Sequence, residues 1–303
     1  MALVDDAFNT YLRRITPPRT QFHAAKRSHH ALRTFLEKDD YFGPMVLETF
    51  LNGSYARGTA IRPIKDVDVI VVVGRDWRMV PPDKAMESLR RKLAVRYPER
   101  RTLRQRRAVR VTLSDMQLDV LLAHDADAGG GLMIPDRRKQ RWISTNPKLQ
   151  LELATALKRA TNSNYASLVK LLKAWFASKV AAPDRPASFV LECGAYHILS
   201  ASPREYAGAL PVAFARLLQE LVRWNWGMTG WFGSWTPDVR DPALRDVNVA
   251  SRWKFGAADR ATSRLKLAVE QIERAGRSRW EESEVDHWQT VFGLSFPAGQ
   301  SLA

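Results

Sequence analysis

The segment DVDVIVVV, residues 66–73, constrains the fold of this chain more than any other stretch. From Val67 onward it is a nearly unbroken run of β-branched residues, which predicts a strand buried inside a sheet. Two further strands are predicted over residues 108–113 and 117–123, separated by a turn at Ser114 and Asp115. The first half of the chain is therefore expected to fold as a mixed β-sheet with helices.

Helical periodicity dominates the rest of the chain. Residues 19–37 follow two prolines and predict a long amphipathic helix, because part-apolar side chains recur at Phe22, Ala25, His29, Leu32 and Leu36. From residue 146 onward the pattern is helical again, and residues 227–250 are expected to form a structured loop. We expect an α+β fold with two lobes around one cleft: a mixed-sheet lobe with a long N-terminal helix over 1–150, and an all-helical lobe over 151–303.

Composition limits the class of protein. The chain has 303 residues, 45% of them hydrophobic, enough to bury a sizeable core in one large domain or two lobes. Its single cysteine, Cys193, excludes an internal disulfide, and no segment has the pattern of a signal peptide or a membrane span. We therefore expect a cytoplasmic protein without a membrane partner, and composition leaves open whether it is a monomer or an oligomer.

The net charge of +15 attracts polyanions such as nucleic acid or nucleoside triphosphates. The excess is concentrated between Arg90 and Arg110, where ten basic residues face the single acid Glu99. Two interpretations stay open: a solvated face that adds solubility, or a surface that binds RNA or DNA through phosphate contacts. The candidate residues for nucleic-acid binding are Arg100, Arg101, Arg104, Arg106 and Arg107.

A constellation suited to nucleotide transfer lies between residues 51 and 119. Gly53 and Ser54 can bring backbone N–H groups and a hydroxyl close to phosphate oxygens. Asp66 and Asp68 are two residues apart on a strand, so their side chains leave the same face roughly 7 Å apart. With Asp119 as a third carboxylate, the trio could hold two Mg²⁺ ions, or Mn²⁺, about 4 Å apart for in-line phosphoryl transfer.

Each part of this constellation also has a structural explanation. A Gly-Ser pair is more often a turn, and an Asp-x-Asp pair at a strand edge is usually solvated surface. The order of the parts favours a site, because a strand, Gly-Ser, Asp-x-Asp and a further carboxylate follow one another. Asp119 also lies among Leu118, Val120, Leu121 and Leu122, where an unpaired carboxylate would be costly to bury, which favours a cation partner.

The segment GSYARGTAIRPIKDVDVIVVV resembles the signature of the bacterial cGAS/DncV-like nucleotidyltransferases (CD-NTases), within the DNA polymerase β-like superfamily. The resemblance continues through LVKLLKAWF, RPASFVLECGAYHIL and DPALRDVNVA, and covers residues 22–250. It implies an enzyme that joins NTPs, ATP or GTP or both, into a cyclic di- or trinucleotide second messenger in anti-phage (CBASS-type) signalling. Where the family commonly has a Val-Val-Pro-Ala-like stretch after the third carboxylate, this chain has VLLAH.

The resemblance also implies roles for individual residues. Gly53 and Ser54 would bind the triphosphate, and Asp66, Asp68 and Asp119 would be the catalytic metal ligands. In the helical half, the nucleotide-binding residues would be Lys170, Lys173, Ser188 and Phe189, with the lysines and serine on the triphosphate and the aromatic ring on a base. RNA or DNA bound to the basic cluster of residues 90–110 would regulate the enzyme, as in the family's animal relatives, cyclic GMP-AMP synthase and oligoadenylate synthase.

Three other functions stay open. The same carboxylates could serve a template-independent enzyme that extends RNA ends. The chain could be a nucleic-acid-binding relative without activity, although all three carboxylates are present. Transfer of AMP to a protein or an antibiotic is the third alternative. The sequence leaves the bases, the linkage, the ring size and the activating trigger open.

Overall fold

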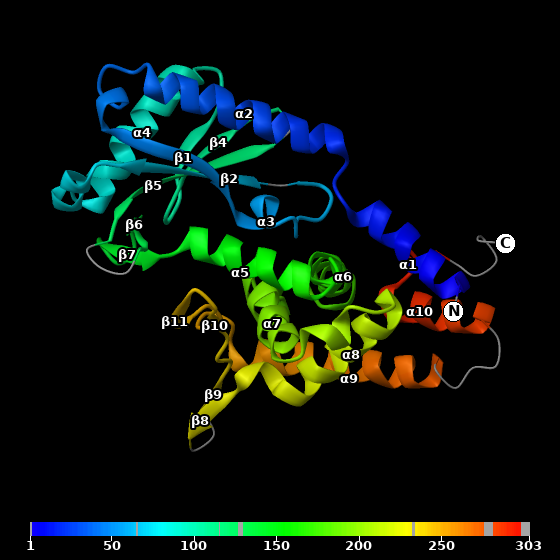
Figure 1. Cartoon of the computed structure of the whole chain (residues 1–303). Coiled ribbons are helices and arrows are strands. Elements are labelled where there is room, and N and C mark those ends of the chain that lie inside the picture. Colours follow the sequence, from blue (N-terminus) through cyan, green and yellow to red (C-terminus); the bar gives the residue numbers. More distant parts are fainter. Residues whose placement is uncertain are drawn as a thin grey trace. The chain divides into compact units, whose positions relative to one another are not determined.

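The computed structural model of this chain describes residues 2–64, 66–114, 116–126, 130–231, 234–275 and 281–297. The chain divides into two units, each described here by itself (Figure 1). Pro17–Leu151 form the sheet unit, and Met1–Thr16 with Glu152–Ala303 form the helical unit. Residues 1–16, predicted from the sequence to belong to the first lobe, thus group with the C-terminal helices.

The sheet unit is built on a seven-stranded mixed sheet in the order β1-β2-β5-β4-β3, with β6 paired to β5 and β7 to β6. Strands β2 and β5 run parallel, and the other pairs are antiparallel. The strands are β1 Val46–Asn52, β2 Asp66–Val73, β3 Thr102–Arg104, β4 Val109–Thr112, β5 Gln117–Asp125, β6 Leu132–Asp136 and β7 Arg141–Thr145. The three predicted strands correspond to β2, β4 and β5, while Asp115 of the predicted turn lies outside the described residues.

Two helices cover one face of this sheet. Helix α2, Arg19–Glu37, confirms the predicted amphipathic helix and buries Ala25, His29, Leu32 and Leu36. It shares a core with α4, Pro82–Arg96, and with the odd-numbered residues of β2 from Val67 to Val73 (Figure 1). Because side chains alternate along a strand, this burial sends the even-numbered residues to the opposite face.

The opposite face of β2 changes character along the strand. Ile70 and Val72 pack with Ala123, Leu132 and Ile134 in a second, smaller core. Asp66 and Asp68, at the beginning of the same strand, are more exposed than the residues that follow. Past Asn52 at the end of β1, the chain turns into the short helix α3, Gly53–Ala56. The sheet therefore presents its polar residues at one end of an otherwise apolar face.

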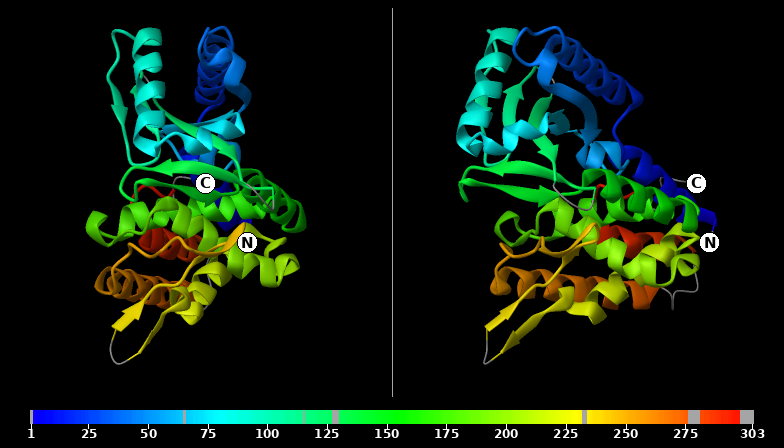
Figure 2. Two further views of the ribbon diagram at one scale, coloured as in Figure 1. Left: turned by 90° about the vertical axis from the view of Figure 1, so that its left-hand side faces the viewer. Right: turned by 60° about the vertical axis from the view of Figure 1, so that its left-hand side comes forward.

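The helical unit encloses its own core. Its helices are α1 Ala2–Ile15, α5 Pro147–Ala160, α6 Asn164–Lys179, α7 Ser188–Ala201, α8 Leu210–Trp224, α9 Phe255–Ala275 and α10 Glu281–Phe292, with the start of α5 counted in the sheet unit. Helix α1 belongs here because Val4, Ala7, Phe8 and Tyr11 form one apolar stripe that enters this core. The Phe8 ring contacts Trp288 edge-on at 4.7 Å between centroids. Figure 2 shows α1 and α10 side by side.

Residues 227–250, expected as a structured loop, carry two short hairpins. The first pairs β8 Thr229–Trp231 with β9 Ser234–Thr236, and the second pairs β10 Arg240–Asp241 with β11 Leu244–Asn248 (Figure 2). Phe232 and Gly233, between the first two strands, lie outside the described residues. The α+β class is confirmed, and the C-terminal lobe is helical apart from these hairpins. None of the helices described is long and apolar enough to cross a membrane.

Candidate active site

One row of polar side chains crosses four neighbouring strands of the sheet. Asp68 on β2 is the register partner of Asn52 on β1 and of Asp119 on β5. Asp119 is in turn the partner of Arg110 on β4. Neighbouring strands are about 4.8 Å apart, so these side chains stand next to one another on the same face. The parallel pairing of β2 and β5 therefore brings together the carboxylates that the sequence separates by 51 positions.

The three carboxylates differ in their exposure to solvent. Asp66, at the start of β2, has a side chain that is 50% exposed, and Asp68 is half-buried. The Asp119 side chain, on β5, is 12% exposed. Asp66 shares the face of Asp68 because it precedes it by two residues. All three predicted metal ligands thus lie on one face of the sheet, and their side chains range from half-exposed to largely buried.

Gly53 lies directly against Asp68. Its φ of +70° is in the left-handed region, and a β-carbon there would stand 1.9 Å from Oδ2 of Asp68. Only glycine fits this contact. Ser54 follows in α3, and its carbonyl accepts the backbone N–H groups of Thr59 and Ala60 at 2.9 and 3.1 Å. The structure therefore places the predicted phosphate-binding pair beside the carboxylates.

Arg110 is a member of this row that the sequence reasoning missed. Its Nε donates to Asp119 Oδ1 at 2.7 Å and its Nη2 to Oδ2 at 2.6 Å. The same Nη2 lies 4.0 Å from Oδ2 of Asp66. The hydrogen bonds to Asp119 raise the pKa of the Arg110 guanidinium above its usual range, and the charges of Asp66 and Asp68 add to this. An arginine nine residues before a buried aspartate, across a predicted turn, is the sequence signal that could have indicated the pair.

The donor chemistry of this row suits a hard divalent cation. Three carboxylates on one face are the oxygen ligands that Mg²⁺ and Mn²⁺ take in proteins. The absence of a side chain at Gly53 lets the Asp68 carboxylate lie directly against the backbone of residue 53. Both oxygens of Asp119 are engaged by Arg110, and no three His, Cys, Asp or Glu side chains of the described residues converge as a finished metal site. The residues fit the cation in kind and lie on one face of the sheet, and Asp119 would be shared between the cation and Arg110.

The nucleotide-binding candidates of the second lobe lie on α6 and α7 of the helical unit. Ser188 is the exposed first residue of α7, and Phe189 is half-buried against the helical core. Lys170 donates to Thr16 Oγ1 at 3.4 Å, and burial lowers the pKa of its ammonium group. Their expected contacts with a nucleotide stay predictions.

Lys173 lies in a different setting from the one expected. Its Nζ is 2.6 Å from Oε1 of Glu192, and the two side chains are 4% and 3% exposed. Helix α6 is buried on nearly every side between Leu168 and Phe176, so Lys173 points into the helical core. The spacing of three residues indicated that Lys170 and Lys173 share a face, but it does not reveal a buried partner on another helix. The predicted contact of Lys173 with a triphosphate is untested, and this pairing does not favour it.

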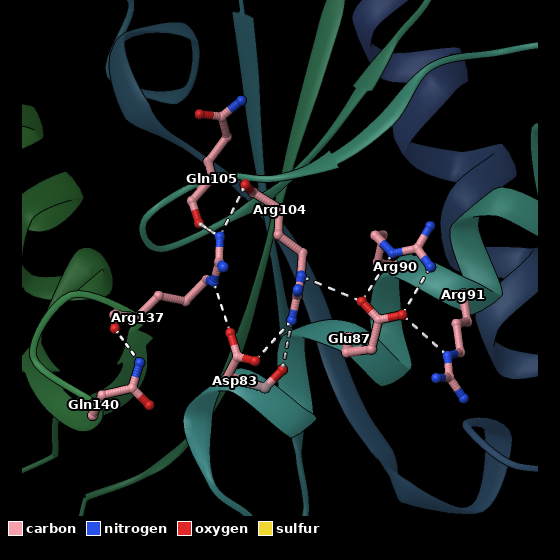
Figure 3. Close-up of polar contacts among 8 residues, drawn as sticks. All are labelled: Asp83, Glu87, Arg90, Arg91, Arg104, Gln105, Arg137 and Gln140. Carbon is pink, nitrogen blue, oxygen red and sulfur yellow. Dashed lines mark hydrogen bonds and ion pairs between the residues drawn. The ribbon is translucent and has the colours of Figure 1, made fainter.

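Most residues of the basic cluster form ion pairs with acids that lie outside residues 90–110. Arg104 pairs with Asp83 at 2.9 Å and with Glu87 at 3.2 Å (Figure 3). Figure 3 also shows Arg90 and Arg91 on Glu87, and Arg137 on Asp83. The hydrogen bonds from Arg90, with those from Arg91, hold the pKa of Glu87 at about 2.

A second ion-pair cluster involves two more of the candidate arginines. Arg106 and Arg107 both bind Asp136, whose side chain is fully buried. Burial alone would raise the pKa of Asp136, but hydrogen bonds from Arg106, the Lys139 N–H and Arg107 outweigh it and lower the pKa to about 2. Arg100 and Arg101 are exposed at the surface. Three of the five arginines proposed for nucleic-acid binding are thus engaged in ion pairs.

Comparison with known proteins agrees with this arrangement. Residues 1–157 match the family described as the Second Messenger Oligonucleotide or Dinucleotide Synthetase (SMODS) domain. A cyclic AMP-AMP-AMP synthase of Acinetobacter sp. is 28% identical over 95% of this chain and 83% of its own length. A cyclic AMP-AMP-GMP synthase of Enterobacter hormaechei is 23% identical over 96% of this chain and 91% of its own.

The fold of this chain is also similar to that of a solved structure. CdnC of E. coli MS115-1, determined with ATP, superposes with a TM-score of 0.78 at 20% sequence identity, over 97% of this chain and 98% of that one. The mixed sheet with its acidic row lies within the matched residues 1–157, and the similarity of fold extends over the helical unit as well. The chain belongs to the SMODS-domain, or CD-NTase, family and is a nucleotidyltransferase.

Proposed function

We propose that this enzyme joins nucleoside triphosphates into a cyclic trinucleotide, with ATP as its main substrate, as a second messenger in bacterial anti-phage signalling. The observation that carries the proposal is the register that sets Asp68 opposite Asp119, with Gly53 against Asp68. The names of the two relatives support the product class, since each contains three nucleotides and at least two adenylates.

The proposed reaction is an in-line displacement at the α-phosphorus of ATP. A ribose hydroxyl oxygen forms a new P–O bond, the bond to the β-phosphate breaks, and pyrophosphate leaves. The hydroxyl proton passes to Asp119 or to water. Repetition of the step on a linear intermediate, followed by closure of its ends, gives the ring. Most of the rate enhancement in such transfers comes from positioning and charge neutralisation.

Asp66, Asp68 and Asp119 would hold two Mg²⁺ ions, which supply positive charge for the triphosphate and lower the pKa of the attacking hydroxyl. The residues of the chain do the rest. Gly53 and Ser54 would bind triphosphate oxygens through their backbone N–H groups and the Ser54 hydroxyl, next to the Asp68 carboxylate. In the helical unit, Lys170 and Ser188 would bind the triphosphate and Phe189 would stack on a base. Ser188 is exposed, and Lys170 and Phe189 are partly buried.

The rival activity is extension of RNA ends by the same carboxylates. A polynucleotide needs a track of accessible cations, whereas Arg104, Arg106 and Arg107 are paired with acids. Incubation of the purified chain with ATP, then with all four NTPs, and with Mg²⁺ distinguishes the two. Phosphatase-resistant products of three nucleotides, identified by mass spectrometry without any primer, are expected. Products that form only on an added RNA primer would support the rival activity.

A further inference from the structure

Arg110 has no part in the chemistry described so far, yet it is bound to a carboxylate on which that chemistry depends. Both oxygens of Asp119 accept hydrogen bonds from its guanidinium, at 2.7 and 2.6 Å. A guanidinium that binds both oxygens fixes the plane of the carboxylate as well as its position. The pair therefore sets the direction in which Asp119 can offer its remaining lone pairs.

The position of Arg110 also makes it the flanking cation of the whole row. It stands on β4 beside Asp119, and its Nη2 lies 4.0 Å from Asp66. Three carboxylates on one face repel one another, and a positive charge at their edge reduces that repulsion. Because the Arg110 and Asp119 side chains are 29% and 12% exposed, water screens this attraction less than at an open surface.

We propose that Arg110 is the positioning residue of this site: it orients Asp119 and provides the counter-charge of the three carboxylates until a divalent cation binds. This inference rests on the proposed function, because it takes Asp66, Asp68 and Asp119 as the metal-holding set. Each carboxylate oxygen has two lone pairs, so Asp119 can serve Arg110 and a cation together. A cation and Arg110 then stabilise the row by the same means, which predicts that one can partly substitute for the other.

An ordinary ion pair elsewhere in the chain gives a matched control. Arg260 binds Asp184 with the same two-pronged geometry, at 2.9 and 2.6 Å, in the helical unit. Arg260→Met removes a pair of the same geometry, whose arginine is 65% exposed, without removing a charge from the row. Arg110→Met removes both the positive charge and the pair of hydrogen bonds to Asp119. Arg110→Lys keeps the charge but loses the planar guanidinium that binds both oxygens.

The first measurement is the melting temperature with and without Mg²⁺, in the absence of nucleotide. In EDTA, Arg110→Met is expected to melt lower than the unmodified protein by roughly 3 to 6 °C, and Arg110→Lys by less. Mg²⁺ is expected to return roughly half or more of the Arg110→Met loss, because it replaces the missing charge. It should return none of the loss in Arg260→Met. A loss in Arg110→Met that Mg²⁺ leaves unchanged would overturn the counter-charge role.

The second measurement separates orientation from stability. With ATP and Mg²⁺, both Arg110 variants are expected to lose about 10- to 100-fold in kcat, with KM for ATP changed by less than about threefold. Arg260→Met should keep the kcat of the unmodified protein. Should Arg110→Met fail to fold, Arg110→Lys still tests the orientation. An Arg110→Lys variant with unchanged kcat would contradict it.

The Asp68→Asn variant distinguishes a wrong role for Arg110 from a wrong metal site. The unmodified protein is expected to melt higher when Mg²⁺ is added, and Asp68→Asn should lose that rise because one metal ligand is gone. If the rise is lost in Asp68→Asn while the Arg110 variants match Arg260→Met, only the role of Arg110 is wrong. If Asp68→Asn keeps the full rise, the carboxylates do not hold the cation, and the proposed site and the role of Arg110 are both wrong.

Discussion

Gly53 and Asp68 touch so closely that a β-carbon at residue 53 would stand 1.9 Å from Oδ2 of Asp68. The contact joins the predicted phosphate-binding turn to a predicted metal ligand, although fourteen residues separate them. It requires glycine twice over, through the absent side chain and through the φ of +70°. This contact can be tested without changing any charge.

Gly53→Ala is expected to displace the Asp68 carboxylate and to lower kcat about 10- to 100-fold, since small displacements of reacting groups are costly. Gly58→Ala is the matched control. Gly58 has a φ of +71°, but a β-carbon there would meet nothing within 4 Å. Both variants carry a backbone strain of about 1–2 kcal/mol, and only Gly53→Ala carries the collision. Equal kcat values in the two variants would mean that the contact does not matter for activity.

The buried pair of Lys173 and Glu192 is expected to stabilise the helical unit rather than to bind nucleotide. Lys173→Met leaves the Glu192 charge buried without its lysine partner, which should lower the free energy of unfolding by about 3–5 kcal/mol. Adding Glu192→Leu should recover most of that loss, because no buried charge remains. Urea unfolding of the single and double variants measures both effects.

The same double variant tests the triphosphate role of Lys173. If Lys173 binds a triphosphate, the double variant will be stable but will need more ATP, with a KM raised severalfold. If it is only a buried ion pair, KM for ATP will stay near that of the unmodified protein. Lys170→Met is the comparison, because Lys170 reaches Thr16 through a hydrogen bond of 3.4 Å and is not held by a carboxylate there.

Asp136 is expected to make the stability of the sheet unit depend on pH. Its pKa is lowered from an ordinary 3.8 to about 2 in the folded protein, chiefly by Arg106, the Lys139 N–H and Arg107 against the cost of burial. A folded pKa below the unfolded one contributes stability that is present above about pH 4 and is lost as the pH falls toward 2. The difference corresponds to about 2 kcal/mol at neutral pH.

Urea unfolding of Asp136→Asn and the unmodified protein at pH 7 and near pH 2 measures this contribution. The gap between the two proteins should be wide at pH 7 and should shrink at the lower pH. Glu205→Gln breaks the half-exposed pair with Arg216 and should change stability by less than about 1 kcal/mol at either pH. A gap for Asp136→Asn that stays constant between the two pH values would contradict the pKa assignment.

The local pattern of the sequence predicted the elements of the site but not their pairing. The β-branched run marked β2, the stripe from Phe22 to Leu36 marked α2, and alternation put Asp66 and Asp68 on one face. That β5 pairs with β2 in parallel, with Asp119 opposite Asp68, depends on the whole sheet. A shift of one residue would have turned Asp119 to the covered face.

Long-range ion pairs were equally beyond the sequence pattern. The count of ten basic residues against Glu99 ignored Asp83, Glu87 and Asp136, which lie before and after the cluster and neutralise much of it. A count of charges along the chain does not include acidic residues that are distant in sequence and pair with these arginines only in the folded protein. The apolar stripe on α1 likewise does not show which core the helix joins.

The ion pairs show which arginines of the basic cluster should be replaced to test nucleic-acid binding. Arg100 and Arg101 are exposed, and reversing both to Glu should weaken RNA or DNA binding while the ion-pair network stays intact. Two lost phosphate contacts would reduce the slope of log affinity against log salt by about 1.4 to 1.8. Reversal of Arg104, Arg106 and Arg107 should instead destabilise the fold. Affinity and salt slope unchanged in Arg100→Glu/Arg101→Glu would exclude this surface as the nucleic-acid site.

The most direct test of the carboxylate row is mass spectrometry of the products that the unmodified protein and Asp68→Asn form from ATP and Mg²⁺. Asparagine keeps the shape of the side chain and removes the charge that holds a cation, so the fold should survive, as the circular dichroism spectrum would record. We predict cyclic triadenylate from the unmodified protein and a loss of at least about a thousandfold in Asp68→Asn. Cyclic product from a folded Asp68→Asn variant at a rate near that of the unmodified protein would contradict the account.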